Sequence, residues 1–111
     1  MAEVKRGDIW LVNLDPTVGH EIKKSRPAVI IQNDLGNEYS PITIIAPITS
    51  QGIGKAYPIE VIVDKISKVL LNQIRAIDKR RLIKKLGKAD YETMAKIDAS
   101  IKISLGLVGI R

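Results

Sequence analysis

Two short apolar runs near the middle of the chain constrain its fold most. The first spans Ala28 to Ile31 and the second Ile42 to Ile48, and both are rich in the β-branched residues that favour strands. The connection from Asn33 to Pro41 contains Asn, Asp, Gly, Ser and Pro, which suit a turn. Arg26 lies just before the first run, and Thr49-Ser50 follows the second. We therefore expect a cation and two hydroxyl groups to meet at one end of a sheet, where they would suit a phosphate.

Similar runs elsewhere predict a sheet of five short strands. No long helical pattern separates the runs, so the strands are expected to form a small twisted sheet that closes into a barrel. The strands are expected at Asp8 to Leu14, Ala28 to Gln32, Thr43 to Ala46, Ile59 to Val63 and Val69 to Ile77, with a further turn at Gln51 to Gly54. The predicted fold class is mainly β with C-terminal helices (α+β), in the form of an SH3-like barrel.

The last third of the chain predicts two helices. Asp78 is a suitable N-cap for a short helix through Leu86, and Gly87 is suited to end it. Asp90 is expected to cap a longer helix, with Glu92 in the first turn where the helix dipole favours an acid. Its apolar residues recur at three- and four-residue steps, namely Met94, Ile97, Ile101, Leu105 and Val108. This amphipathic stripe is expected to pack the helix against the barrel.

Length, cysteine content and charge narrow the class of protein. A chain of 111 residues is expected to form one domain, spanning residues 1–111. There are no cysteines, the first residues lack the apolar core of a signal peptide, and no run is long enough to cross a bilayer. We therefore expect a cytoplasmic protein that does not associate with membranes. The formal charge of +6 favours a polyanionic partner.

Metal and nucleotide chemistry find little support in the sequence. His20 is the one histidine, and no pair of carboxylates is placed to hold an ion on one face of an expected element. Gly52 and Gly54 lack the lysine that follows a phosphate-binding glycine loop. We therefore expect neither a metal nor a cofactor.

Cleavage of RNA needs no metal, because the 2′-hydroxyl of the substrate can attack the neighbouring phosphate. Arg26 offers a fork of N–H donors that matches phosphate oxygens, and Thr49 and Ser50 offer neutral donors. The base that removes the proton could be Glu21, His20 or Arg26 itself, and the sequence leaves all three open. Composition and spacing alone also fit a basic β-rich domain on which the same residues are solvated charges and turn residues.

Six short motifs follow one another in register from Lys5 to Leu107. They are Arg6-Gly7-Asp8-Ile9, Asp15-Pro16-Thr17-Val18-Gly19, Arg26-Pro27-Ala28-Val29, Gln32-Asn33-Asp34, Ile48-Thr49-Ser50 and Leu71-Asn72-Gln73-Ile74-Arg75-Ala76-Ile77-Asp78-Lys79. In this order they resemble the motifs of the MazF/PemK toxins of bacterial toxin–antitoxin systems. The resemblance rests on the occurrence of all six motifs in register.

The resemblance implies a fold, an activity and two catalytic residues. It implies a barrel of the type shared with the gyrase-poisoning toxin CcdB, assembled as a homodimer. It also implies a metal-independent endoribonuclease that cuts single-stranded RNA at a short sequence and leaves a 2′,3′-cyclic phosphate and a 5′-hydroxyl. Arg26 and Thr49 match the catalytic arginine and threonine of the family.

Further residues match positions that contact RNA in these toxins, and with them we group Arg75. The expected substrate contacts are Arg6, Glu21, Ser50, Gln73, Arg75 and Arg81. Gln73 and Glu21 can read base edges in an unpaired strand, whereas the arginines are better suited to phosphates. The chain departs from the family motifs at His20, where a serine is usual, at Asn72, where a glutamate is common, and between Val63 and Val69, where it is shorter.

The resemblance also implies a protein partner. Toxins of this kind are neutralised by an antitoxin whose acidic, flexible tail covers the basic RNA groove, and a charge of +6 suits such a tail. Two alternatives remain open at this point. One is a toxin of the same fold that binds and poisons DNA gyrase without cutting RNA, and the other is a regulator that binds nucleic acid without cleaving it.

Overall fold

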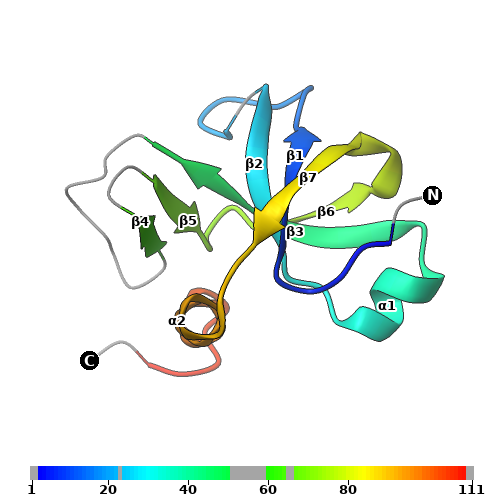
Figure 1. Cartoon of the computed structure of the whole chain (residues 1–111). Helices are drawn as coiled ribbons and strands as arrows, with labels where there is room; N and C mark the ends of the chain where they lie inside the picture. Colours follow the sequence, from blue (N-terminus) through cyan, green and yellow to red (C-terminus); the bar gives the residue numbers. More distant parts are fainter. Residues whose placement is uncertain (1–2, 23, 51–59, 65–66, 110–111) are drawn as a thin grey trace.

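The computed structural model describes residues 3–22, 24–50, 60–64 and 67–109. Figure 1 shows a strongly twisted sheet with α1 and α2 towards one end and the loop between β1 and β2 at the other. The elements are β1 (Asp8–Asn13), β2 (Ser25–Ile30), α1 (Asp34–Tyr39), β3 (Ile42–Thr49), β4 (Glu60–Asp64), β5 (Ser67–Leu70), β6 (Arg75–Asp78), the 3₁₀ helix η1 (Lys79–Arg81), β7 (Leu82–Lys88) and α2 (Tyr91–Ser104).

The described strands form one antiparallel sheet in the order β4-β5-β3-β2-β1-β7, and β6 pairs with β3 beside this path. The predicted fold class, mainly β with a C-terminal helix, is confirmed. The twisted sheet resembles a barrel, but among the described strands β4 and β7 do not pair with each other, so the sheet is not closed. The expected turn at Gln51 to Gly54 lies outside the described residues.

The predicted fifth strand, Val69 to Ile77, is two strands. β5 and β6 both run along the edge of β3 that faces away from β2, but their registers differ. Ile48 pairs with Val69, whereas Ile45 pairs with Arg75, so extra residues leave the ladder between the two strands. This interruption carries Asn72 and Gln73 out of the sheet and helps to form the site described below.

The predicted helix from Asp78 to Leu86 is wrong. Asp78 does cap a helix, but η1 is only three residues long, and β7 follows it at once. β7 pairs with β1, with Lys84 opposite Leu11 and Lys85 opposite Trp10. The reason is tertiary: β1 has backbone groups to pair on its second edge, and that pairing overrides a local helix signal.

The two α-helices differ in how well the sequence indicates them. α1 occupies the connection expected to be a turn, where Asn33 caps it by accepting a hydrogen bond from the N–H of Gly36 at 2.8 Å. The Asp90 cap of α2 is confirmed, because its carboxylate accepts a hydrogen bond from the N–H of Thr93 at 2.7 Å. α2 ends at Ser104, so the expected stripe is shortened and its last two members, Leu105 and Val108, are exposed beyond the helix.

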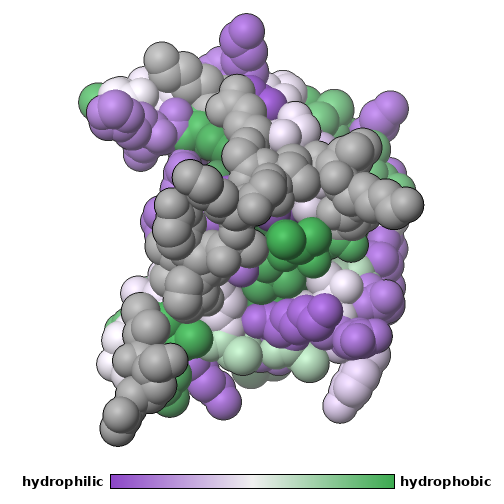
Figure 2. Space-filling view, turned by 90° about the vertical axis from the view of Figure 1, so that its left-hand side faces the viewer, coloured by the Kyte–Doolittle hydropathy of each residue, from purple (hydrophilic) through white to green (hydrophobic). Residues whose placement is uncertain are grey.

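The side of the molecule formed by β4, β5 and α2 is mixed in character. Figure 2 views this side and shows hydrophobic residues exposed among hydrophilic ones. Ile62 on β4 is 47% exposed, and Leu105 just after α2 is 61% exposed. No helix within the described ranges is long and apolar enough to cross a membrane.

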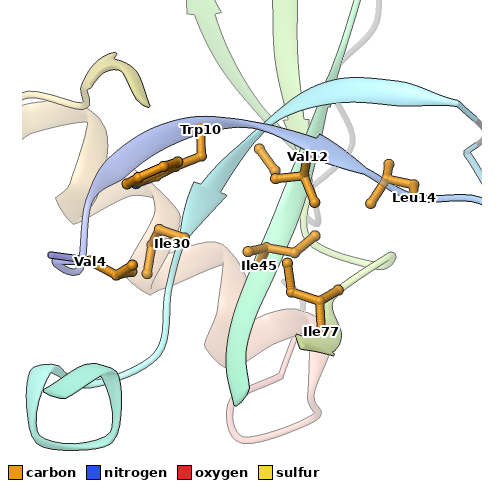
Figure 3. Close-up of a cluster of buried hydrophobic side chains, with 8 residues drawn as sticks. Val4, Trp10, Val12, Leu14, Ile30, Ile45 and Ile77 are labelled. Atoms are coloured by element: carbon orange, nitrogen blue, oxygen red, sulfur yellow. The ribbon is translucent and has the colours of Figure 1, made fainter. Parts of the chain in front are cut away.

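The hydrophobic core consists of two clusters on opposite faces of the sheet. Figure 3 shows one cluster, formed by Val4, Trp10, Val12, Leu14, Ala28, Ile30, Ile45 and Ile77. The second lies beneath α2 and is formed by Val29, Ala46, Ile48, Val61, Val69, Leu71 and Ile97. β2 and β3 contribute neighbouring residues to both clusters, which explains why they appear as continuous apolar runs in the sequence.

Gly7 joins the N-terminal segment to β1 and packs against α2. Its φ of +93° is a conformation that residues with a Cβ rarely adopt. Its N–H donates to the carbonyl of Ile30, and its carbonyl accepts from the N–H of Ala89. A glycine here therefore fixes the turn that starts β1 next to the start of α2.

Candidate active site

Arg26 and Thr49 lie on neighbouring strands that run in opposite directions. The paired residues of β2 and β3 are Ala28 with Pro47, Val29 with Ala46, and Ile30 with Ile45. The same register, continued by two residues, carries Arg26 to the level of Thr49. Arg26 lies within β2 and Thr49 is the last residue of β3, so the sheet holds both residues. The sequence analysis placed them just outside the two strands.

Arg26, Thr49 and Ser50 line one pocket of about 370 Å³, called here the Arg26 pocket. Thr49 is only 6% exposed, Arg26 is partly exposed and Ser50 is exposed. The structure thus brings together three of the residues that the sequence indicated. The sequence did not indicate the other lining residues, because only the pairing of the strands reveals them: Ile9, Pro27, Ile48, Val63 and Ser67.

The Arg26 pocket combines a cation, hydroxyl groups and apolar walls. A guanidinium presents parallel N–H donors that match two oxygens of a phosphate. Ile9, Ile48 and Val63 form part of the wall and reduce the contact with water, which strengthens electrostatic interactions inside. Such a pocket is suited to stabilising negative charge that develops on a phosphate.

A second pocket of about 390 Å³, called here the Gln73 pocket, contains three of the expected substrate contacts, Glu21, Gln73 and Arg75. Pro47 also lines it and precedes Thr49 by two residues on β3, so the two pockets adjoin along this strand. The remaining lining residues are Leu14, Val18, His20, Ile22, Asn72 and Ile74. His20 and Asn72, two of the positions where the chain departs from the family motifs, therefore meet in one pocket.

Backbone groups hold the polar side chains of the Gln73 pocket. The Oε1 atom of Gln73 accepts a hydrogen bond from the N–H of Ile22 at 2.9 Å. Arg75 donates from Nη1 to the carbonyl of Leu14 at 3.0 Å. One carboxylate oxygen of Glu21 accepts from the N–H of Val18. The loop between β1 and β2 and the interruption between β5 and β6 are thus tied together at this pocket.

Two candidates for the general base lie in the Gln73 pocket. Glu21 and His20 both line it, and neither lines the Arg26 pocket. Arg26, the third candidate, lines the Arg26 pocket together with Thr49. The identity of the base stays a prediction with these three candidates.

Arg6 lines neither pocket and makes structural contacts instead. Its guanidinium donates to Asp98 on α2 at 2.7 Å and to the carbonyl of Ile31 at 2.8 Å. Its backbone N–H donates to Asp34 at 2.6 Å, and this hydrogen bond is the main reason that the pKa of the Asp34 carboxyl lies below its usual value. A contact of Arg6 with RNA stays a prediction that the structure does not place at either pocket.

Arg81 also lies outside both pockets. It donates from Nη1 to the carbonyls of Asn13 at 3.1 Å and Asp15 at 2.5 Å. These bonds join η1 to the end of β1 and the start of the loop that carries Glu21. A direct contact of Arg81 with RNA likewise stays a prediction.

A buried ion pair lies beside Thr49 and was not indicated by the sequence. Lys68 on β5 is the pairing partner of Thr49 on β3. Its ammonium lies 2.8 Å from a carboxylate oxygen of Glu60 on β4, and the two side chains are 7% and 11% exposed. No local signal identifies this pair, because it depends on the register of the β4–β5 hairpin.

No group of three His, Asp or Glu side chains that could hold a metal ion is found within residues 3–22, 24–50, 60–64 and 67–109. The expectation of a metal-independent reaction stays a prediction.

A twisted antiparallel sheet with a C-terminal helix, which holds an arginine and a threonine in one pocket, defines a small β-rich protein. A family model described as PemK-like, MazF-like toxin of type II toxin-antitoxin system matches residues 5–105. The chain belongs to this family.

Relatives with high identity over nearly the whole chain agree with the family. Endoribonuclease EndoA of Bacillus subtilis (strain 168) is 44% identical over 112 aligned positions, which cover 95% of this chain and 97% of that protein. Endoribonuclease MazF of Staphylococcus epidermidis is 46% identical over 112 positions, which cover 94% and 92%.

Solved structures share the fold. A crystal structure of MazF from Deinococcus radiodurans superposes with a TM-score of 0.81 at 27% identity and covers 96% of this chain and 99% of that chain. A mycobacterial endoribonuclease in complex with its cognate antitoxin also gives a TM-score of 0.81, with the same coverage and 21% identity.

Proposed function

We propose that this protein is a cytoplasmic, metal-independent endoribonuclease toxin that cuts single-stranded RNA at a short sequence. The observation that carries the proposal is the shared pocket of Arg26 and Thr49. Family membership and the two relatives named as endoribonucleases support it.

The proposed reaction is an internal phosphoryl transfer. A base removes the proton of the ribose 2′-hydroxyl, and the 2′-oxygen forms a bond to the adjacent phosphorus. The bond from phosphorus to the 5′-oxygen of the next nucleotide breaks, and that oxygen takes up a proton. The products are a 2′,3′-cyclic phosphate and a 5′-hydroxyl, and no metal or oxidant is needed. Arg26 and Thr49 would stabilise the negative charge on the phosphate oxygens in the transition state.

The Gln73 pocket would hold a nucleotide next to the cleaved bond. It adjoins the Arg26 pocket along β3, and it combines polar groups with apolar walls that can contact the face of a base. Ser50 would contact the phosphate from the rim of the Arg26 pocket. Arg6 and Arg81 would act, if they contact RNA, on phosphates outside the two pockets.

A cognate antitoxin with an acidic, flexible tail is the proposed protein partner. The net charge of +6 would attract such a tail, and the tail would block RNA by covering the pockets. The mycobacterial neighbour is itself described in complex with its cognate antitoxin. An acidic tail peptide that bound the protein without reducing RNA cleavage would contradict occlusion.

A homodimer is the proposed assembly. Exposed apolar residues near β4 and the end of α2, among them Ile62 and Leu105, offer a surface that a second copy could cover. Sedimentation of the purified protein at the monomer mass, at micromolar concentration, would contradict this assembly.

Loss of Arg26 provides the test of the proposed activity. We expect Arg26→Ala to reduce cleavage of an unstructured RNA, measured with EDTA present, by about 10²-fold or more, as for loss of a donor to a transition state. Arg80→Ala is the matched control, because Arg80 is exposed on η1 and lines neither pocket.

A folded Arg26→Ala protein that cuts RNA as fast as the wild type would reject the mechanism. The alternative function, binding of DNA gyrase without RNA cleavage, predicts that the wild type itself leaves RNA intact and inhibits gyrase. Incubation of the wild type with RNA and, separately, with gyrase distinguishes the two functions.

A further inference from the structure

The positive charge of the chain is concentrated in η1 and β7. Residues 79–88 contain six lysines and arginines and no aspartate or glutamate, so their charge of +6 equals the formal net charge of the whole chain. β7 is the last strand in the described order of the sheet, and most of its residues are exposed. This edge of the molecule is therefore a candidate surface for a negatively charged partner.

Four of these six cations have partners in the structure. Arg80 binds the carboxylate of Asp78 at 3.1 Å, and the ammonium of Lys85 lies 3.3 Å from the carboxylate of Asp8. The other two cations of η1 donate hydrogen bonds to backbone carbonyl groups. The two that remain, Lys84 and Lys88, are exposed, and their side chains make neither a hydrogen bond nor an ion pair within the part of the chain that the structure describes.

Lys84 and Lys88 lie on opposite sides of the sheet. Lys84 pairs with Leu11 on β1, and Lys88 pairs with Asp8. Directly paired residues point to the same side of a sheet, and successive residues of a strand point to opposite sides. Leu11 and Asp8 are three residues apart on β1, so their side chains point to opposite sides, and the two lysines follow them.

The side of the sheet that carries Lys84 also carries part of the Arg26 pocket. Leu11 pairs with Pro27 on β2 as well as with Lys84 on β7, and Pro27 lines the Arg26 pocket. The three residues therefore form one row across β2, β1 and β7, which are neighbouring strands (Figure 1). Two strand spacings separate the ends of this row by about 10 Å.

The surface next to the pocket is open at the neighbouring row. Gly87 on β7 pairs with Ile9 on β1, and Ile9 lines the Arg26 pocket. A Cβ atom at Gly87 would have no other atom within 4 Å. β7 therefore leaves space beside Ile9 through which a single strand of RNA can leave the pocket, and Lys84 lies on the same side of the strand.

We propose that Lys84 binds a phosphate group of the RNA that flanks the cleaved bond. This inference rests on the proposed ribonuclease function and deepens it by adding a binding residue outside both pockets. The phosphate of the cleaved bond would lie in the Arg26 pocket, and a phosphate one or two nucleotides away can reach an ammonium in the next row of the sheet. Lysine binds a phosphate as a point charge, so this contact adds affinity without reading sequence.

A lysine on an edge strand can also serve only to prevent pairing with another chain. This role would apply equally to Lys84 and Lys88, because both lie on β7. It predicts no effect of either lysine on RNA binding. Binding of a flanking phosphate predicts an effect of Lys84 alone, so the two lysines form a matched pair for the test.

The first measurement is the salt dependence of RNA binding. The ligand is a short single-stranded RNA with 2′-deoxyribose before the cut, so that the full-length protein binds it without cleaving it. Each phosphate contact to a single strand adds about 0.7 to the slope of log affinity against log salt concentration. We expect Lys84→Gln to lower the steepness of this slope by about 0.7, and Lys88→Gln and Lys84→Arg to keep the wild-type slope.

The second measurement identifies the phosphate. Uncharged methylphosphonate replaces one phosphate of the RNA at a time. We expect one flanking position at which this change weakens binding by the wild type and has no effect on binding by Lys84→Gln, because the contact is already lost.

Three results would each overturn the inference. They are equal slopes for Lys84→Gln and the wild type, equal reductions in Lys84→Gln and Lys88→Gln, and the absence of any position at which the effect of methylphosphonate depends on Lys84. If the wild type still cuts the all-ribose RNA in EDTA, the proposed function stands despite such a result. A wild type that cuts no RNA would overturn the function and the inference together.

Discussion

At the scale of single residues, Thr49 is a buried residue with a hydroxyl, and the register of β2 and β3, continued by two residues, brings it level with Arg26. The side chain is 6% exposed and lines a pocket with apolar walls. In such surroundings a hydrogen bond to a developing charge is stronger than it would be in water. The contribution of Thr49 should therefore appear in the rate of the chemical step more than in binding of the substrate.

Thr49→Val removes the hydroxyl and keeps the branched shape. We expect kcat for a short RNA substrate to fall on the order of 10²- to 10³-fold with little change in KM, because the lost donor acts mainly in the transition state. Thr49→Ser keeps the hydroxyl and should retain most of the rate. Equal kcat values for Thr49→Val and the wild type would show that the hydroxyl has no role in the reaction.

The sequence could indicate individual residues of the site but not their surroundings. Arg26 and Thr49 were indicated by their places beside β-rich runs and by family motifs. The bond between Gln73 and the N–H of Ile22 joins residues far apart in the sequence, so no local pattern predicts it. The same holds for Arg6, whose position suggested RNA binding and whose guanidinium binds Asp98 in the structure.

At the scale of elements, the β4–β5 hairpin supports the site through the ion pair of Lys68 and Glu60. Lys68 pairs with Thr49 across β3 and β5, and its ammonium binds Glu60 on β4. Both side chains are almost entirely buried, where an ion pair stabilises charges that would be costly to bury singly.

Lys68→Met should destabilise the protein, because it removes the ammonium that lies 2.8 Å from the nearly buried carboxylate of Glu60. We expect the free energy of unfolding to fall by about 3 kcal/mol, measured by urea denaturation. The double variant Lys68→Met with Glu60→Leu removes both charges and should recover much of the loss. A single variant as stable as the wild type would show that the pair makes no net contribution.

The elements also show where local patterns fail. The helix expected from Asp78 to Leu86 has a good cap and a suitable end, yet β7 forms there because β1 offers an edge to pair with. The expected fifth strand has the right pattern on both sides of Asn72 and Gln73, and the difference in register along β3 is what divides it. In both cases the deciding contacts are with distant segments.

At the scale of the whole molecule, exposed carboxylates make stability depend on pH. The pKa of Asp34 is lowered mainly by the hydrogen bond from the N–H of Arg6, and the pKa of Asp90 is lowered mainly by the hydrogen bond from the N–H of Thr93. The folded protein therefore binds fewer protons at these groups than the unfolded chain does over the acid range. Their stabilising effect is complete above the ordinary pKa of a carboxyl group and is lost as the pH falls through the lowered value.

Urea unfolding followed from pH 6 downwards should show this dependence. We expect the wild type to lose stability as the pH falls below about 4, where unperturbed aspartates begin to take up protons. Asp34→Asn keeps an oxygen to accept from Arg6 and removes the titration, so its stability should fall less steeply over the same range. Identical slopes for the two proteins would contradict the assignment to Asp34.

The overall architecture was largely predictable from the sequence, but its closure was not. Short apolar runs and the Asp90 cap sufficed for a mainly β fold with a C-terminal helix. An open sheet with one hydrophobic cluster on each face depends on which strands pair, and the pattern of apolar residues does not specify that.

The central claim is that Arg26 and Thr49 promote attack of the substrate's own 2′-hydroxyl. The most direct test is analysis of the ends that the wild-type protein leaves on a short single-stranded RNA in EDTA. We expect a 2′,3′-cyclic phosphate on the upstream fragment, a 5′-hydroxyl on the downstream fragment, and no cleavage when the nucleotide before the cut carries 2′-deoxyribose. Fragments with a 5′-phosphate, or cleavage of the 2′-deoxy substrate at the normal rate, would contradict this mechanism.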